Sequence, residues 1–161
     1  MNIHEYQGKA LLKGFGVAIQ EGIIADTPEQ AVEAAKELQK QTGTGWWVVK
    51  SQIHAGGRGK GKIVGTDQSG VALAKSLDAV KTISTTILGN NLVTLQTSAQ
   101  GKKVNKVLIA QDVYYPGETP TKEFYMSVLL DRAKGRNAIV YSTEGGMDIE
   151  TVAHNTPHLI Y

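Results

Sequence analysis

Residues 46–62 read WWVVKSQIHAGGRGKGK and join a short apolar strand to a glycine-rich basic loop. Residues of β-forming type lead to Lys50, and glycines then alternate with Arg58 and two lysines. Glycine lets the backbone approach a ligand closely, so its N–H groups can face an anion that the cations neutralise. We therefore expect this stretch to bind phosphate, and a solvated, lysine-rich surface hairpin is the alternative.

The residue that follows the loop argues against two common phosphate-binding motifs. The spacing of Gly56, Gly61 and Lys62 nearly matches a P-loop, but Ile63 stands where a hydroxyl is needed for Mg²⁺. A dinucleotide fingerprint fails because its third glycine is out of register and no helix is expected next. Ile63 and Val64 instead predict a returning strand, so we expect the loop to join two antiparallel strands of one hairpin.

Composition limits the class of protein. A chain of 161 residues with 41% hydrophobic residues can build one domain or two small lobes with a buried core. A net charge of +2 is too small for a general binder of nucleic acid. The absence of cysteine excludes disulfides, and no apolar run reaches the length of a signal peptide or membrane span. We expect a cytoplasmic protein that binds neither membranes nor nucleic acid.

Helices and strands are expected to alternate before residue 110. Helices are predicted to begin after Asn2, after Thr27 and at about Ser69, with glycines ending each of them. Thr27 is the clearest start, because Pro28 suits the first helical position and Gln30 completes a capping box. The buried face of this helix is predicted to consist of Ala31, Ala34, Ala35 and Leu38. Strands are predicted at residues 17–19, 23–25, 46–50, 63–64, 92–97 and 104–113. The last of these is expected to pair with residues 92–97.

A second sheet is expected after the loop at residues 116–120. Residues 122–130 alternate, with Phe124 on the apolar face and Glu123 on the polar one, and residues 137–141 return as a hairpin. A short helix is expected at residues 147–153. Glu123 could accept a hydrogen bond from a ribose hydroxyl, although pattern alone favours an ordinary polar sheet face. The four histidines lack the spacing of a metal or catalytic site, and we interpret them as structural.

Seven stretches together resemble one known family. They are residues 1–7 (MNIHEYQ), 48–50 (VVK), 54–60 (HAGGRGK), 92–97 (LVTLQT), 122–125 (KEFY), 142–146 (STEGG) and 156–160 (TPHLI). In this order they are similar to the amino-terminal part of the β subunits of succinyl-CoA synthetase, also called succinate–CoA ligase. The resemblance implies an α+β, ATP-grasp fold with two lobes of mostly antiparallel sheets and packed helices. Residues 27–109 would form the smaller lobe, and residues 1–26 with 110–161 an incomplete part of the other.

The resemblance also implies a nucleotide site. Lys50 would contact a nucleotide phosphate, and Gly57, Arg58 and Gly59 would form the loop that closes over it. Residues 110–113, from Ala110 to Val113, would be a hinge whose backbone meets the base. Glu123 would lie at the ribose, and Gln20 would lie near the base. Gln20 could donate to a guanine oxygen, so GTP stays open beside the favoured ATP. Ala110 replaces a glutamate of some relatives, and residues 116–121 look like an added loop.

The family enzyme joins succinate to CoA at the expense of a nucleoside triphosphate, a reaction of the tricarboxylic acid cycle. Its phosphohistidine belongs to an α subunit, so the resemblance implies that subunit as partner and no catalytic residue in this chain. Ligases for malate or citrate share parts of the pattern. The Mg²⁺ ligands are expected beyond Tyr161, and we expect a piece of a longer chain that is inactive alone. The alternative is a non-catalytic module whose basic hairpin docks an acidic partner or RNA.

Overall fold

A computed structural model describes residues 2–114, 121–146 and 149–161. The chain divides into two compact units, Met1–Val113 and Tyr114–Tyr161. Each unit is described by itself below. Residues 1–26 fall in the first unit, and the predicted assignment of these residues to a second lobe stays a prediction.

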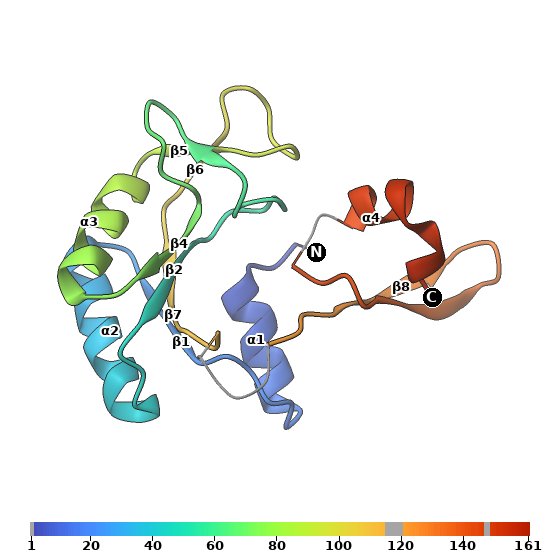
Figure 1. Ribbon diagram of the computed structural model, residues 1–161, viewed down its shortest axis with the longest axis horizontal. Coiled ribbons are helices and arrows are strands. Elements are labelled where there is room, and N and C mark those ends of the chain that lie inside the picture. Colours follow the sequence, from blue (N-terminus) through green and yellow to red (C-terminus); the bar gives the residue numbers. More distant parts are fainter. Residues whose placement is uncertain (1, 115–120, 147–148) are drawn as a thin grey trace. The chain divides into compact units, whose positions relative to one another are not determined.

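An antiparallel sheet of four strands forms the centre of the first unit, in the order β1-β7-β2-β4. These strands are β1 (Gly22–Ala25), β7 (Val107–Gln111), β2 (Trp47–Ser51) and β4 (Val71–Ala74). The helices are α1 (Glu5–Gly14), α2 (Pro28–Thr42) and α3 (Leu77–Ile87). Figure 1 shows α2 and α3 side by side on one face of this sheet and α1 on the other. The hydrophobic core lies between the sheet and the α2–α3 pair.

The start of α2 follows the capping rules that its sequence predicts. The Thr27 hydroxyl accepts a hydrogen bond from the N–H of Gln30 at 3.2 Å, and the Gln30 side chain accepts from the N–H of Asp26 at 2.8 Å. Gly43 ends the helix with a φ of 74°, a conformation that glycine adopts at low cost. The predicted buried face is confirmed at Ala31, Ala34, Ala35 and Leu38.

Two predicted helix starts were wrong. The first helix is capped at His4, not Asn2, and the Gln7 side chain accepts from the N–H of His4 at 2.8 Å. The third helix begins at Leu77, because Ser76 accepts from the N–H of Ala79 at 3.1 Å and caps it locally. The residues before Ser76 form strand β4, which pairs with β2. The apolar pattern of residues 71–74 fits either a helix or a strand, and the cap at Ser76 decides where the helix begins.

The predicted hairpin across the glycine-rich loop was also wrong. Strand β3 (Lys62–Ile63) does not pair with β2 but with β5 (Asn91–Val93), in a small sheet ordered β3-β5-β6, where β6 is Lys102–Lys103. The loop therefore connects two sheets. Its base is fixed by the N–H of Ser51, which donates to the Gly70 carbonyl at 2.8 Å, and by the N–H of Gly70, which donates to the Arg58 carbonyl at 3.1 Å.

The remaining strand predictions of this unit need smaller corrections. Residues 17–19 are not a strand, and residues 94–97 form a turn in which the N–H of Thr97 donates to the Thr94 carbonyl at 3.2 Å. Residues 104–113 were expected to pair with 92–97. The strand there is instead the shorter β7, and it pairs with β1 and β2.

The second unit contains the predicted hairpin. Strands β8 (Tyr125–Asp131) and β9 (Arg136–Ser142) pair antiparallel, and the helix α4 (Ile149–Asn155) and the 3-10 turn η1 (Pro157–Leu159) follow. An isolated bridge joins Ser142 to Ile160. The apolar face predicted for β8 is exposed in this unit: the side chain of Val128 is 66% exposed. Two residues of the predicted short helix, 147 and 148, lie outside the described residues.

Candidate phosphate site

Strand alternation decides where Lys50 points. Along β2, Trp47, Val49 and Ser51 are buried, whereas the two residues between them are only half-buried. Lys50 therefore faces away from the α2–α3 core and toward the face that α1 covers (Figure 1). There its Nζ lies 2.6 Å from Oε1 of Glu5, the first residue of α1.

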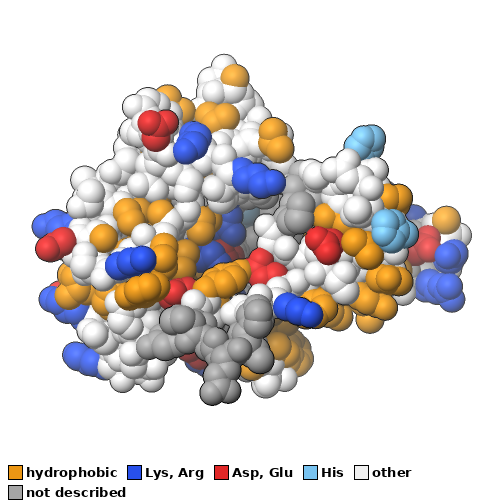
Figure 2. Space-filling model, in the orientation of Figure 1, with side chains coloured by type: hydrophobic (Ala, Val, Ile, Leu, Met, Phe, Trp, Pro, Cys, Tyr) orange, Lys and Arg blue, Asp and Glu red, His pale blue; other side chains and the backbone are white. Residues whose placement is uncertain are grey.

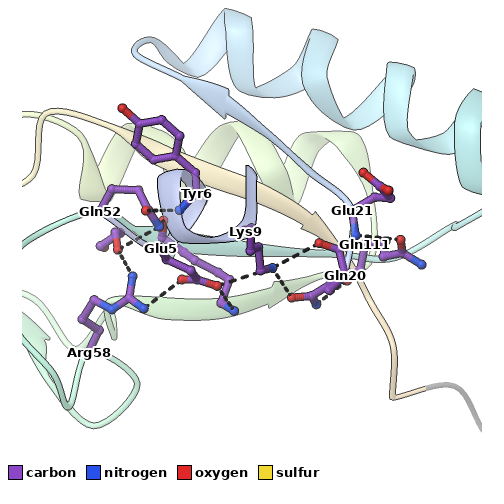
Figure 3. A network of polar contacts seen from close by, with 10 residues as sticks. Glu5, Tyr6, Lys9, Gln20, Glu21, Gln52, Arg58 and Gln111 are labelled. Carbon is purple, nitrogen blue, oxygen red and sulfur yellow. Dashed lines mark hydrogen bonds and ion pairs between the residues drawn. The ribbon is translucent and has the colours of Figure 1, made fainter. Parts of the chain in front are cut away.

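Arg58 reaches the same carboxylate from the glycine-rich loop. Its Nη2 donates to Oε2 of Glu5 at 2.8 Å, and its Nη1 donates to the backbone carbonyl of Ser51 at 2.6 Å. Figure 3 shows the Arg58 fork directed at Glu5 from below α1. The side chains of Lys50 and Arg58 are each 20% exposed and that of Glu5 is 18% exposed. The two predicted phosphate cations thus converge on one point, which a carboxylate occupies.

The electrostatics of this cluster keep Glu5 ionised. Burial alone would raise the pKa of Glu5, but the charges and hydrogen bonds of Lys50 and Arg58 outweigh burial and lower this pKa to about 2. A third cation, Lys9, lies one helical turn along α1 with its Nζ 3.5 Å from Oε1 of Glu5. Burial lowers the pKa of Lys9, and the neighbouring charge of Lys50 lowers it further. Counting these four side chains alone, two positive charges are in excess, which favours a further anion.

The glycine-rich loop turns tightly at Gly57 and leaves open space beside Gly59. Gly57 has a φ of 71°, and its carbonyl accepts from the N–H groups of Lys60 at 3.1 Å and Gly61 at 2.9 Å. Apart from Gly59 itself and its two chain neighbours, no described residue has an atom within 4 Å of a Cβ built on Gly59. A side chain at this position would meet open space, so there is room for a ligand beside the loop.

A polar cavity of about 510 Å³ adjoins this loop, and Glu5, His54, Gly56, Arg58 and Gln96 are among its lining residues. Its volume is within the range of small-molecule sites. The N–H of Gly56 is already engaged, because it donates to Oε1 of Gln96 at 2.7 Å. A groove of about 610 Å³ lies elsewhere, along α2, and Lys81 is the sole cation among its described lining residues. We assign the phosphate interpretation to the cavity beside Arg58.

The predicted hinge is linked to the same cluster. Ala110 is buried in β7, where it pairs with Gly22 and Val48. Nε2 of Gln20 donates to the Gln111 carbonyl at 2.6 Å, and Nζ of Lys9 donates to Oε1 of Gln20 at 2.9 Å. Figure 3 shows this chain of contacts running from Glu5 through Lys9 and Gln20 to Gln111.

Two of the predicted contact residues are not joined to the cluster by a described contact. Val113 follows the hinge strand and its side chain is 44% exposed. Glu123 belongs to the second unit, where it is exposed and its carbonyl accepts from the N–H of Gly145 at 3.1 Å. Its place at a ribose stays a prediction. Residues 116–120 of the added loop lie outside the described residues.

Sequence reasoning missed Glu5, Lys9 and Gln111 as members of this network. Glu5 and Lys9 stand four residues apart in a predicted helix, a spacing that places both on one face. This spacing can be read from the sequence. The contact of Glu5 with Lys50 cannot, because only the fold brings α1 over β2. The described residues contain no group of three His, Asp or Glu side chains that could hold a metal ion, and no described helix is long and apolar enough to cross a bilayer.

A family model for the ATP-grasp domain matches residues 2–161. The chain belongs to the ATP-grasp family. The fold predicted from the resemblance is thereby confirmed, and the antiparallel sheets with packed helices are the ATP-grasp architecture of this chain.

Curated relatives support the narrower resemblance. The chain is 65% identical over 161 residues to a protein of Flavobacterium psychrophilum and 63% identical to one of Christiangramia forsetii, both named succinate–CoA ligase [ADP-forming] subunit beta. A protein of the same name from Rhizorhabdus wittichii is 52% identical over 163 residues. The matches cover 99% or more of this chain but 39% of each relative. The predicted resemblance to these β subunits is therefore confirmed over the amino-terminal part alone.

A solved structure shares the ATP-grasp fold at low sequence identity. It is a dinucleotide-forming acetyl-coenzyme A synthetase 1 of Ca. Korarchaeum cryptofilum, in complex with coenzyme A, acetyl-coenzyme A and a phosphorylated phosphohistidine segment. The TM-score is 0.55 at 17% identity, over 89% of this chain and 53% of that chain. This likeness shows the fold, and the functional argument rests on the residues above.

Proposed function

We propose that this ATP-grasp chain is the nucleotide-binding part of the β subunit of an ADP- or GDP-forming acid–CoA ligase, with succinate as the acid. The names of the relatives support the reaction class. The observation that carries the proposal is the convergence of Lys50 and Arg58 on one point beside an open glycine-rich loop. Malate or citrate as the acid would require the same nucleotide site.

The chemistry of the cluster suits phosphoryl transfer. Such transfer depends on holding phosphate oxygens in place and neutralising their charge, which cations and backbone N–H groups do. In the proposal Lys50 provides a point charge and Arg58 a planar fork that grips two oxygens. The N–H groups of residues 57–59 complete the phosphate contacts.

The other end of the nucleotide would meet the hinge. We assign the base to the backbone of residues 110–113, with Gln20 beside it, and the ribose to Glu123. Because Nε2 of Gln20 already donates to the Gln111 carbonyl, a guanine oxygen would have to compete for this amide. This favours ATP over GTP in the proposal.

The remaining parts of the reaction would come from outside this chain. The two-lobe division at residues 27 and 110, the α subunit with its phosphohistidine, and a cytoplasmic location stay within the proposal. Mg²⁺ would neutralise nucleotide phosphates, and its ligands are proposed to lie beyond Tyr161. Among the described residues no three His, Asp or Glu side chains lie together as a metal ion would need.

The alternative, a basic hairpin that docks an acidic partner or RNA, is disfavoured because the glycine-rich loop connects two sheets and forms no hairpin. On the face in Figure 2, lysine and arginine side chains form separate spots between apolar and acidic ones. A strand of RNA requires a continuous basic track. Lys50 and Arg58, which are partly buried beside Glu5, suit a compact anion better than a strand of RNA.

Titration of the chain with ATP, GTP and a short RNA, followed by amide chemical shifts, tests the proposal. We expect ATP to shift the Lys50, Gly57 and Gly59 amides with one dissociation constant. Lys50→Ala should weaken this binding. Lys81→Ala should not, because Lys81 pairs with Glu29 at the groove along α2. Micromolar RNA binding without any nucleotide effect on these amides would refute the proposal.

A further inference from the structure

The contacts of Glu5 assign it a role that neither the resemblance nor the relatives' names give. We propose that Glu5 is an internal counter-ion that nucleotide phosphate displaces from Lys50 and Arg58, and that Lys9 receives the displaced carboxylate. Glu5 would then set the affinity of the site for nucleotide. This inference rests on the function proposed above, and the experiment below separates the two.

The first support is the geometry of the carboxylate. Each of its oxygens accepts from one of the two cations, at 2.6 Å from Lys50 and 2.8 Å from Arg58. These are the charge-assisted contacts that two phosphate oxygens would make with the same donors. A phosphate that reaches these donors meets a like charge already in place, and the two anions repel each other.

The second support is that protonation cannot relieve this repulsion near neutral pH. The pKa of Glu5 is lowered to about 2 after the opposing effect of burial, so the side chain stays an anion. Binding of phosphate to both cations therefore requires the carboxylate to move. A rotation of the Glu5 side chain is the smallest change that clears the donors.

The third support is a cation placed to accept the moved carboxylate. Nζ of Lys9 lies 3.5 Å from Oε1 of Glu5, on the same face of α1 and one turn further along. Lys9 also donates to the carbonyl of Gln20 at 3.2 Å and to its side-chain oxygen at 2.9 Å. A stronger Glu5–Lys9 pair would loosen these contacts, and Gln20 binds the hinge carbonyl of Gln111. Phosphate binding would thus alter the contacts of Gln20 at the base-binding end of the site.

The test compares the dissociation constants of ATP and of inorganic tripolyphosphate for the wild-type chain and for Glu5→Gln. Removal of the competing charge should tighten both ligands by about threefold or more. Glu33→Gln is the matched control, because Glu33 is exposed on α2 and pairs only with Lys36 among the described residues, at 2.7 Å. Its affinity should equal that of the wild type. Unchanged or weaker binding by Glu5→Gln would overturn the inference.

A double-mutant cycle tests the receiving cation. Lys9→Gln should weaken ATP binding when Glu5 is present and have a smaller effect in the Glu5→Gln background, because no carboxylate then needs a partner. Equal effects in both backgrounds would refute the role of Lys9. If the wild type binds no ATP, or if Lys50→Ala binds it equally well, the proposed function fails together with this inference. ATP binding that Lys50→Ala weakens and Glu5→Gln does not strengthen refutes the inference alone.

Discussion

The indole Nε1 of Trp47 donates a hydrogen bond of 2.9 Å to the backbone carbonyl of Ala35. Trp47 is the first residue of β2 and is 3% exposed, and Ala35 lies on the buried face of α2. Small side chains on that face let the helix approach the sheet closely enough for this contact. The strand that presents Lys50 is thereby anchored to the core at its other end.

Replacing this tryptophan tests the anchor. Trp47→Phe keeps an aromatic ring but removes the hydrogen-bond donor, so the free energy of unfolding should fall by about 1–3 kcal/mol. Trp46→Phe is the control, since Trp46 is 39% exposed and its ring contacts Lys75. That change should stay within about 0.5 kcal/mol. Urea denaturation of both variants measures the difference, and equal losses would contradict the anchor.

The lowered pKa of Glu5 predicts an acid-sensitive stability. The group is more acidic when folded, at about 2 against an ordinary value of 4.5, so its contribution is complete above pH 4.5 and is lost as the pH falls toward 2. The loss should reach roughly 3 kcal/mol. Urea denaturation at several pH values measures it. Glu5→Gln should flatten this part of the profile, and a slope equal to that of the wild type would contradict the assigned cause.

The two cations should contribute separately to nucleotide binding. Lys50→Ala and Arg58→Ala each remove a charge-assisted contact, so each should weaken ATP binding by about 1–3 kcal/mol. Calorimetric titration or amide shifts give the constants. Lys134→Ala, on the β8–β9 turn and paired with Asp131 at 3.6 Å, is an exposed control that should bind as the wild type does. Unchanged affinity in both test variants would eliminate the site.

Replacement by alanine should lower the stability of the protein at Gly70 but not at Gly59. A Cβ on Gly70 would contact the Leu92 side chain and lie 2.8 Å from the Arg58 carbonyl, so Gly70→Ala should cost about 1–3 kcal/mol of stability. The Cβ of Gly59→Ala meets no described residue within 4 Å apart from its chain neighbours, and stability should change by no more than about 0.5 kcal/mol. If the loop backbone contacts phosphate, Gly59→Ala should still weaken ATP binding. A stable variant with full affinity would exclude contact at Gly59.

Features fixed by local chemistry were predictable from the sequence. The cap at Thr27 and the buried alanine face of α2 depend on residues within two turns of one another, and the structure confirms them. The β8–β9 hairpin was predictable for the same reason. The start of α3 was not predictable, because the apolar pattern of residues 71–74 fits a helix as well as a strand. Only their pairing with β2 makes them a strand.

Long-range pairing and charge compensation could not be predicted. Nothing near Ile63 in the sequence indicates that its partner is Leu92 rather than a residue of β2. The cations of the candidate site were identified from the glycine-rich pattern and the family resemblance. Their shared partner, Glu5, was not, because it lies more than forty positions from both and meets them only when α1 covers β2.

The position of β7 has a consequence for how the first unit assembles on the ribosome. β7 lies between β1 and β2, so residues 107–111 must be synthesised before either strand has its shared neighbour. Leu108 is the β7 partner of Lys50 in that register. Such non-local pairing forms slowly and leaves strand edges open during synthesis. Lys50 and Arg58 therefore acquire their fixed geometry only after residues 107–111 have been synthesised, when α1 and the glycine-rich loop already exist as chain.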